Sequence, residues 1–384
     1  MGVSNDKAVP KSALILSGGG ARAAYQAGVL KAVARLLPAD APLPFRVLCG
    51  TSAGAINAAT LAVYAHDFQK GVRRLNMVWR GFRVGHVFRA DTLGILKSGL
   101  HWMTALLVGG LGRYNPVSLL DRTPLQNLLH QHLDCSQIQV AIDSGYLDAI
   151  SITASGYTSE QSVAFFQGRK DYSGWSRARR IGVSAQIGIE HLMASSAIPF
   201  LFRAVKINRE YFGDGSMRQG APLSPGIHLG AKKLLVIGVH AEQQTPERRK
   251  ADIYPSMAKI GGHVLNSIFL DSLDGDLERL ERINETVEHV GHRRVRNVGL
   301  HKVEALVISP SKDLGEMASA HLARLPRPLR YLLRGIGAIN RDDSSFVSYL
   351  MFDAAYCREL ISLGYADAMR KRDELSAFLN ASAN

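Results

Sequence analysis

The sequence predicts an α/β protein of three layers, a mostly parallel sheet flanked by helices, with a helical extension at its C-terminal end. Two stretches support this prediction, because each combines an apolar strand, a tight glycine-containing turn and a helix: ALILSGGGARAAYQAGVLKAVARLL (13–37) and FRVLCGTSAGAINAATLAVYA (45–65). Consecutive units of this kind require parallel strands joined by helical crossovers. With 46% hydrophobic residues, the chain of 384 residues can also bury a sizeable core.

Further along the chain, apolar runs alternate with turns and then give way to helical periodicity. The patterns predict a short helix that ends at Pro199, a single strand that runs into a turn at 205–216, further strands at 147–157, 161–168, 232–240 and 301–310, and long helices at 268–290 and 344–379. We therefore divide the chain into a first part, 12–230, and a C-terminal part, 231–384, which completes the sheet and adds helices.

Cysteine usage and the N-terminal residues predict a cytoplasmic protein. Cys49, Cys135 and Cys357 are odd in number and far apart in sequence, which argues against a disulfide framework and for a reducing compartment. The N-terminal residues lack a hydrophobic segment of secretory length, and no stretch is apolar over the length that a transmembrane helix requires.

The formal net charge of +13 predicts an anionic partner. The basic residues form scattered clusters without a recognisable nucleic-acid-reading element, so we do not expect nucleic acid as a partner. An anionic membrane surface is the remaining candidate, and residues 98–112, with Trp102 beside apolar neighbours, form either an interfacial element or a buried helix. Nothing in the sequence specifies an oligomeric state.

The stretch GTSAG places Ser52 between Gly50 and Gly54, after a predicted strand and before a predicted helix. This context is the one in which the G-x-S-x-G motif presents a nucleophilic serine on a sharp turn at the carboxyl end of a sheet. The flanking glycines fit such a turn because a side chain at either position would collide with the neighbouring strand or helix. The alternative is a turn serine that caps the following helix.

The first turn, SGGGAR, offers what an acyl-transfer intermediate needs from its surroundings. Gly18, Gly19 and Gly20 supply backbone N–H groups at a helix start, and Arg22 adds a cation, so together they can stabilise an oxyanion. The competing interpretation is a phosphate-binding loop. Ala23 stands where the third glycine of a dinucleotide fingerprint is expected, and no Gly-Lys-Ser/Thr sequence is present, so nucleotide binding is not predicted.

A serine nucleophile also requires a base, and two residues are candidates. His240 follows the predicted strand LLVIGVH, where a hydrolase of the Ser-Asp-His type would carry its histidine. Asp214, in the glycine turn FGDGS, could accept the serine proton directly, although an Asp-Gly pair is also an ordinary turn.

Four elements in chain order resemble the patatin-like phospholipase family over roughly residues 12–230: SGGGARAAYQAGVL (17–30), GTSAGAINA (50–58), ASSAIPFLF (194–202) and FGDGS (212–216). The resemblance implies that 12–230 is a patatin-like catalytic domain and that the protein is a serine lipid acyl hydrolase of the phospholipase A or esterase type. It further implies a Ser-Asp dyad, with Ser52 as nucleophile and Asp214 as general base, and an acyl lipid or phospholipid as substrate. No cofactor and no metal are expected.

Carried over by position, the resemblance assigns the oxyanion loop and the residues that flank the dyad. The family's oxyanion-hole glycines correspond to Gly18, Gly19 and Gly20, its basic loop residue to Arg22, and its motif glycines to Gly50, Gly54 and Gly215. Ala23 and Ser216 depart from the family pattern, and both are small replacements that we expect to alter substrate fit or rate.

Alternatives to this assignment stay open at the level of sequence. A Ser-Asp-His triad esterase would use His240, and a catalytically weak lipid-binding protein would not depend on Ser52. An acyltransferase would follow the same chemistry with an alcohol in place of water. The acidic set Asp271, Asp274, Asp276 and Glu278 lacks the spacing of a calcium loop, and we interpret it as the solvent-facing side of an amphipathic helix.

Overall fold

The structure is a computed structural model, and it describes residues 11–89, 100–101, 103–104, 107–108, 112, 117–241, 257–269, 271–290, 300–335 and 344–383. The strands in this part of the chain are β1 (Ser12–Leu16), β2 (Val47–Thr51), β3 (Ala149–Gly156), β4 (Ser162–Gly168), β5 (Trp175–Arg177), β6 (Arg180–Ser184), β7 (Val205–Ile207), β8 (Glu210–Asp214), β9 (Lys233–Ile237) and β10 (Glu304–Ile308).

The α-helices with described bounds are α1 (Ala24–Leu36), α2 (Ala53–Val63), α3 (Phe68–Arg80), α4 (Val84–Val87), α6 (Thr123–His132), α7 (Ser136–Asp143), α8 (Ile189–Ser195), α9 (Ser224–His228), α10 (Met257–Phe269), α11 (Asp271–Val290), α13 (Leu314–Ser319), α14 (Arg327–Gly335), α15 (Ser344–Leu350), α16 (Ala354–Arg370) and α17 (Arg372–Ala383). Short 3-10 helices are η1 (Gly20–Ala23), η3 (Gly215–Arg218) and η4 (Leu322–Arg324).

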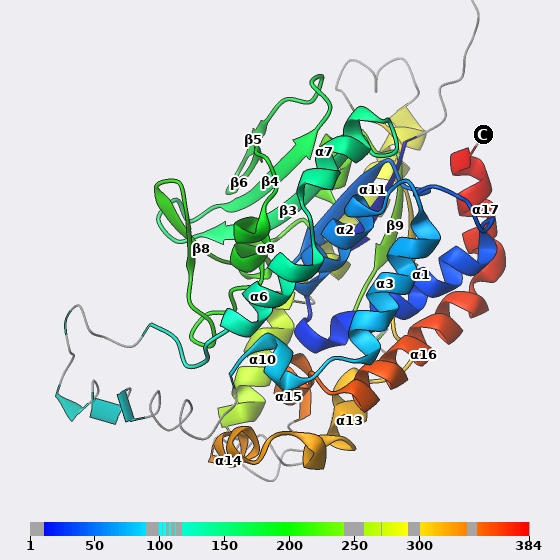
Figure 1. The fold of residues 1–384 in the computed structure, drawn as a ribbon. Coiled ribbons are helices and arrows are strands. Elements are labelled where there is room, and N and C mark those ends of the chain that lie inside the picture. The colour runs from blue at the N-terminus through cyan, green and yellow to red at the C-terminus, as the bar shows by residue number, and fades with distance from the viewer. Residues whose placement is uncertain are drawn as a thin grey trace, which may run out of the picture.

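All of the described strands join one sheet, in the order β10-β9-β1-β2-β3-β4-β6-β5, while β8 pairs with β3 and β7 pairs with β8 (Figure 1). The pairs from β10 to β3 are parallel, and β4 and β8 both run antiparallel to β3. The predicted α/β class with a mostly parallel sheet is therefore confirmed. Both strand-turn-helix units are present as β1 with α1 and β2 with α2.

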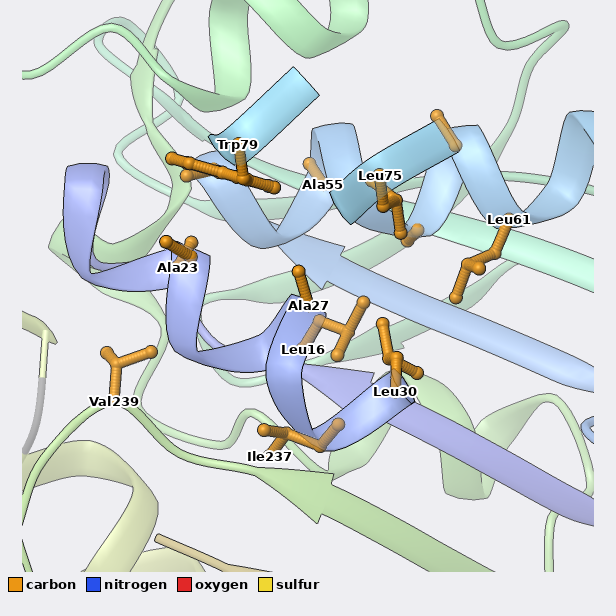
Figure 2. Close-up of a cluster of buried hydrophobic side chains, with 14 of the residues drawn as sticks. Leu16, Ala23, Ala27, Leu30, Ala55, Leu61, Leu75, Trp79, Ile237 and Val239 are labelled. Carbon is orange, nitrogen blue, oxygen red and sulfur yellow. The ribbon is translucent and has the colours of Figure 1, made fainter. Parts of the chain in front are cut away.

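Alternation along the strands sends side chains to two apolar layers, one on each face of the sheet. Leu14 and Leu16 belong to the larger core, which α1, α2, α3 and α16 cover, whereas Ala13 and Ile15 face a smaller core under α9 and α11. Figure 2 shows part of the larger core, where Leu16 of β1 and Ile237 of β9 lie beneath Ala27 and Leu30 of α1.

The C-terminal part shares its core with the first part of the chain. β9 pairs with β1 and β10 with β9, so residues on both sides of the expected boundary at 230 build the same sheet. Helices α1 and α16 pack so closely that only glycine fits at Gly28 of α1. A Cβ there would lie 2.1 Å from the carbonyl oxygen of Ile361 on α16. The matching position on α16 is Gly364, where a Cβ would lie 2.2 Å from the carbonyl oxygen of Tyr25.

Some local elements differ from the sequence prediction. The single helix expected over 344–379 is broken into α15, α16 and α17, and α16 starts after Asp353, whose side chain accepts hydrogen bonds from Ala355 N and Tyr356 N. The expected single strand over 205–216 is instead a hairpin, in which β7 and β8 are antiparallel and pair Val205 with Phe212. Asn208 in its turn has a φ of 53°, in the left-handed region that asparagine adopts more readily than most residues. A separate finding concerns helices: none in the described part of the chain is long and apolar enough to cross a membrane.

Candidate active site

Ser52 occupies the sharp turn between β2 and α2, and its backbone is in a conformation that costs energy. Its φ of 54° and ψ of −127° lie outside the regions that residues with a side chain normally populate. The glycines at either side make this turn possible: a Cβ at Gly50 would lie 2.6 Å from Ala55 Cα, and one at Gly54 would lie 2.3 Å from Leu16 O. The turn therefore depends on both flanking glycines.

The turn is held by a neighbouring serine. Ser52 N donates to Ser195 Oγ at 2.8 Å, and Ser195 Oγ donates to the carbonyl oxygen of Thr153 at 2.6 Å. The side chain of Ser52 makes no capping hydrogen bond to α2, so the interpretation as a helix-capping serine does not describe its contacts.

Asp214 lies at the end of β8, close to the carboxyl ends of the parallel strands β2 and β3. β8 is paired with the C-terminal half of β3, where Asp214 is opposite Ala154, and this brings the carboxylate toward the turn after β2. Ser52 Oγ donates a hydrogen bond of 2.7 Å to Asp214 Oδ2. The following residue, Gly215, leaves no room for a side chain, since a Cβ there would lie 2.1 Å from Thr153 O. Two residues 162 positions apart are thereby brought into direct contact.

Both partners are withdrawn from water, with exposed fractions of 2% for Ser52 and 0% for Asp214. Burial disfavours the charged carboxylate and raises the pKa of Asp214 to about 6. Hydrogen bonds from Ser52 and Ser216 and the charge of Arg122 act in the opposite direction and limit the rise. A carboxyl group with this pKa is mostly ionised at neutral pH and is a stronger base than an exposed one.

Arg122 is a buried cation near this carboxylate that the sequence analysis did not single out. Its guanidinium donates to Ser196 Oγ at 3.3 Å and to Arg203 O at 2.8 Å, and lies over the ring of Phe202. Burial lowers the pKa of Arg122 to about 10, while the negative charge of Asp214 raises it. No motif marks this residue, because its relation to Asp214 exists only in the folded chain.

The glycine-rich loop follows β1, the parallel neighbour of β2, so it lies beside Ser52 at the carboxyl ends of these strands. Gly20 has a φ of 55° and packs so tightly that a Cβ would lie 2.3 Å from Tyr349 O, while one at Gly19 would lie 2.6 Å from Val239 Cγ2. Among the described residues, no acceptor receives the backbone N–H of Gly18, Gly19 or Gly20. These three glycines are buried, and Gly20 lines the same pocket as Ser52.

The side chain of Arg22 makes other contacts than those expected for an oxyanion-binding cation. Its guanidinium donates to Ser348 Oγ at 2.7 Å, to Tyr349 Oη at 3.3 Å, and to both Oγ and O of Ser345 at 3.2 Å. These partners all belong to α15, so Arg22 connects the glycine-rich loop to the C-terminal part of the chain. The sequence could not reveal this role, since the partners lie more than 320 positions away.

The remaining candidates of the sequence analysis lie elsewhere. His240 follows β9, which is separated from β2 by β1, and the hydroxyl of Ser52 bonds to Asp214. Asp276 accepts a hydrogen bond from Leu223 N at 2.9 Å, and no group of three or more metal-binding side chains occurs in the described part of the chain. Trp102 lies outside the described residues.

A pocket opens directly at Ser52, and its walls are almost entirely apolar. α2, α3 and α6 form most of the wall, and Phe202 and Leu350 also line the pocket. A hydrophobic chain attached to a carbonyl at Ser52 would find apolar contacts along most of the wall.

Comparisons with known proteins identify a family for more than half of the chain. The family model described as patatin-like phospholipase matches residues 14–227. No curated protein sequence matches the chain. Among solved structures, the chain is similar to the crystal structure of VipD from Legionella pneumophila, with 13% sequence identity, a TM-score of 0.35, and coverage of 95% of this chain and 67% of that one.

Proposed function

The chain belongs to the patatin-like phospholipase family, and we propose that it is a serine lipid acyl hydrolase in which Ser52 and Asp214 form a catalytic dyad. Membership of this family indicates lipid hydrolysis in general. We assign the reaction to Ser52 and Asp214. The observation that carries it is the 2.7 Å hydrogen bond from Ser52 Oγ to Asp214 Oδ2, within a buried pair at the mouth of an apolar pocket.

In the proposed reaction, the Asp214 carboxylate accepts the proton of Ser52 while Oγ attacks the carbonyl carbon of an acyl ester. The oxygen of the tetrahedral intermediate takes the negative charge and is held by N–H groups of Gly18, Gly19 and Gly20. The intermediate collapses, and the leaving alcohol takes the proton from Asp214.

Water completes the cycle by attack on the acyl-enzyme. It gives its proton to Asp214, the ester bond to Ser52 breaks, and the serine regains its proton as the fatty acid leaves. The buried location of the dyad excludes bulk water from the charged transition state and so strengthens its stabilisation by the backbone dipoles.

The substrate in this proposal is an acyl lipid or phospholipid, reached by peripheral contact with an anionic membrane. The net charge of +13 supports the electrostatic part of this contact, which salt should weaken. Co-sedimentation with vesicles of anionic and of neutral lipid, at low and high salt, measures it.

Fatty-acid release from phospholipid vesicles and from a short-chain chromogenic ester tests the assignment. Ser52→Ala should abolish release from both, whereas Ser151→Ala is a matched control, since Ser151 is a buried serine whose hydroxyl has no partner among the described residues. If Ser52→Ala keeps wild-type turnover, the dyad proposal is wrong. If no variant and no wild-type protein releases fatty acid while vesicle binding persists, the lipid-binding alternative takes its place.

A further inference from the structure

The pocket at Ser52 extends between α2, α3 and α6, and we call this part of it the channel. On α2, the residues that face it are Ala53, Ile56, Asn57 and Thr60, which follow the three- and four-residue spacing of one helix face. Leu75, Val78 and Trp79 of α3 and the leucines of α6 form the opposite wall. Leu75 and Trp79 lie beside α2 in Figure 2.

A hydrogen bond fixes how α3 lies along α2. Trp79 Nε1 donates to Asn57 Oδ1 at 2.9 Å, and the amide nitrogen of Asn57 donates to Ala23 O and Gln26 Oε1. The polar atoms of Asn57 therefore all have protein partners. An acyl chain that passes Asn57 would not deprive it of a hydrogen bond. Further along, Gly71 of α3 packs near Tyr64 at the end of α2, so the two helices run antiparallel.

The apolar wall ends at the level of Thr60, where Arg74 and His132 meet. One terminal nitrogen of Arg74 lies 2.9 Å from His132 Nδ1, and the buried Nε of Arg74 has no partner among the described residues. Both side chains line the channel. A methylene group pressed against this guanidinium would displace its solvation without offering a hydrogen bond in return, which is unfavourable.

The length between the two ends follows from helix geometry. Thr60 is eight residues beyond Ser52, which corresponds to about 12 Å along an α-helix. An extended carbon chain advances about 1.25 Å per bond, given a bond length of about 1.52 Å and an angle of about 111°. The apolar part of the channel therefore matches an acyl chain of about ten carbons.

We propose that this channel sets the acyl-chain length of the substrate, with Arg74 as the residue that determines its limit. The preferred substrates are esters of medium-length, unbranched fatty acids, whose terminal methyl group reaches the contact between Arg74 and His132. The inference rests on the proposed hydrolase function, because it places the acyl carbonyl at Ser52.

Binding of unbranched alcohols from butanol to tetradecanol, measured by calorimetry, tests the limit without any need for turnover. In wild type, the dissociation constant should fall about fourfold for each methylene group that enters the channel, and stop falling at about ten carbons. Arg74→Leu extends the apolar wall and should let the gain continue to longer alcohols. Arg73→Leu is the matched control, because Arg73 is an exposed neighbour on α3 that does not line the channel.

Hydrolysis of chromogenic esters of the same chain lengths separates the two proposals. Turnover that depends on Ser52 but shows no length limit, or a limit that Arg74→Leu leaves unchanged, overturns the chain-length proposal alone. A limit in alcohol binding that shifts in Arg74→Leu, together with no ester turnover, supports the channel and overturns the hydrolase assignment. His132→Leu should shift the limit in the same direction as Arg74→Leu.

Discussion

The guanidinium of Arg22 lies over the ring of Tyr349, with Cζ 4.1 Å from the ring centroid, and so joins the glycine-rich loop to α15. The hydrogen bonds to Ser345, Ser348 and the tyrosine hydroxyl surround the same group. This contact explains how a loop near the N-terminus is held in place by residues near position 350. Arg22, which the sequence predicts to help stabilise an oxyanion, therefore has a structural role in the described contacts.

Replacing Arg22 should therefore lower stability first. Arg22→Met removes buried hydrogen bonds to a charged group and leaves their acceptors unpaired, which should reduce the free energy of unfolding by about 2 to 4 kcal/mol. Urea unfolding measures this change, and Arg73→Met, at an exposed position, serves as the control. Loss of turnover in Arg22→Met at unchanged stability would argue instead for direct contact with the reacting ester.

The pKa of Asp214 predicts the acidic limb of the pH profile. Asp214 acts as a base only when ionised, so protonation below a pKa of about 6 should remove activity. On a short-chain ester, kcat/KM should fall roughly tenfold per pH unit below this value and reach a plateau above it. A limb near pH 4, the ordinary value of a carboxyl group, would contradict the buried environment described for this residue. Circular dichroism at each pH confirms that the protein stays folded.

Arg122 should control the position of that limb. Its positive charge lowers the pKa of Asp214, so Arg122→Gln should move the limb to higher pH, whereas Arg122→Lys, which keeps the charge, should restore it. Arg203→Gln, at an exposed neighbouring position, should leave the limb where it is in wild type. A purely structural role of Arg122 would lower the yield of folded protein without any shift of the limb.

Gly54 should tolerate no side chain. In Gly54→Ala, the new Cβ would meet Leu16 O at 2.3 Å and Ser17 O at 2.6 Å, both backbone atoms that cannot move independently. We expect a loss of about 1 to 3 kcal/mol in stability, and a loss of turnover because the same turn positions Ser52. Gly85→Ala, where no atom lies within 4 Å of the new Cβ, should change neither. Normal activity in Gly54→Ala would mean that the turn has more room than described.

Local sequence patterns predict the elements of the fold better than they predict the contacts around the candidate active site. The two strand-turn-helix units were visible because their apolar periodicity and glycine turns lie within 25 residues of sequence. The hairpin of β7 and β8 was missed, because its turn at Asn208 lacks glycine and proline and leaves a continuous strand-like pattern.

The proximity of Ser52 and Asp214 could be expected only from the family resemblance, since nothing in either local stretch specifies the pairing of β8 with β3. Arg122 and the partners of Arg22 were invisible for a related reason. Their contacts join residues between 74 and 327 positions apart, and such contacts arise from the packing of whole elements rather than from a motif. The channel between α2, α3 and α6 is likewise a product of helix packing.

The most direct test of the dyad is reaction with an alkyl fluorophosphonate, followed by intact-protein and peptide mass spectrometry. The proposal predicts a single adduct on Ser52 in wild type, Ser151→Ala and His240→Ala, no adduct in Ser52→Ala, and labelling of Asp214→Asn that is slower by orders of magnitude. Labelling of Asp214→Asn at the wild-type rate, with its loss in His240→Ala, would contradict the dyad and favour a histidine base.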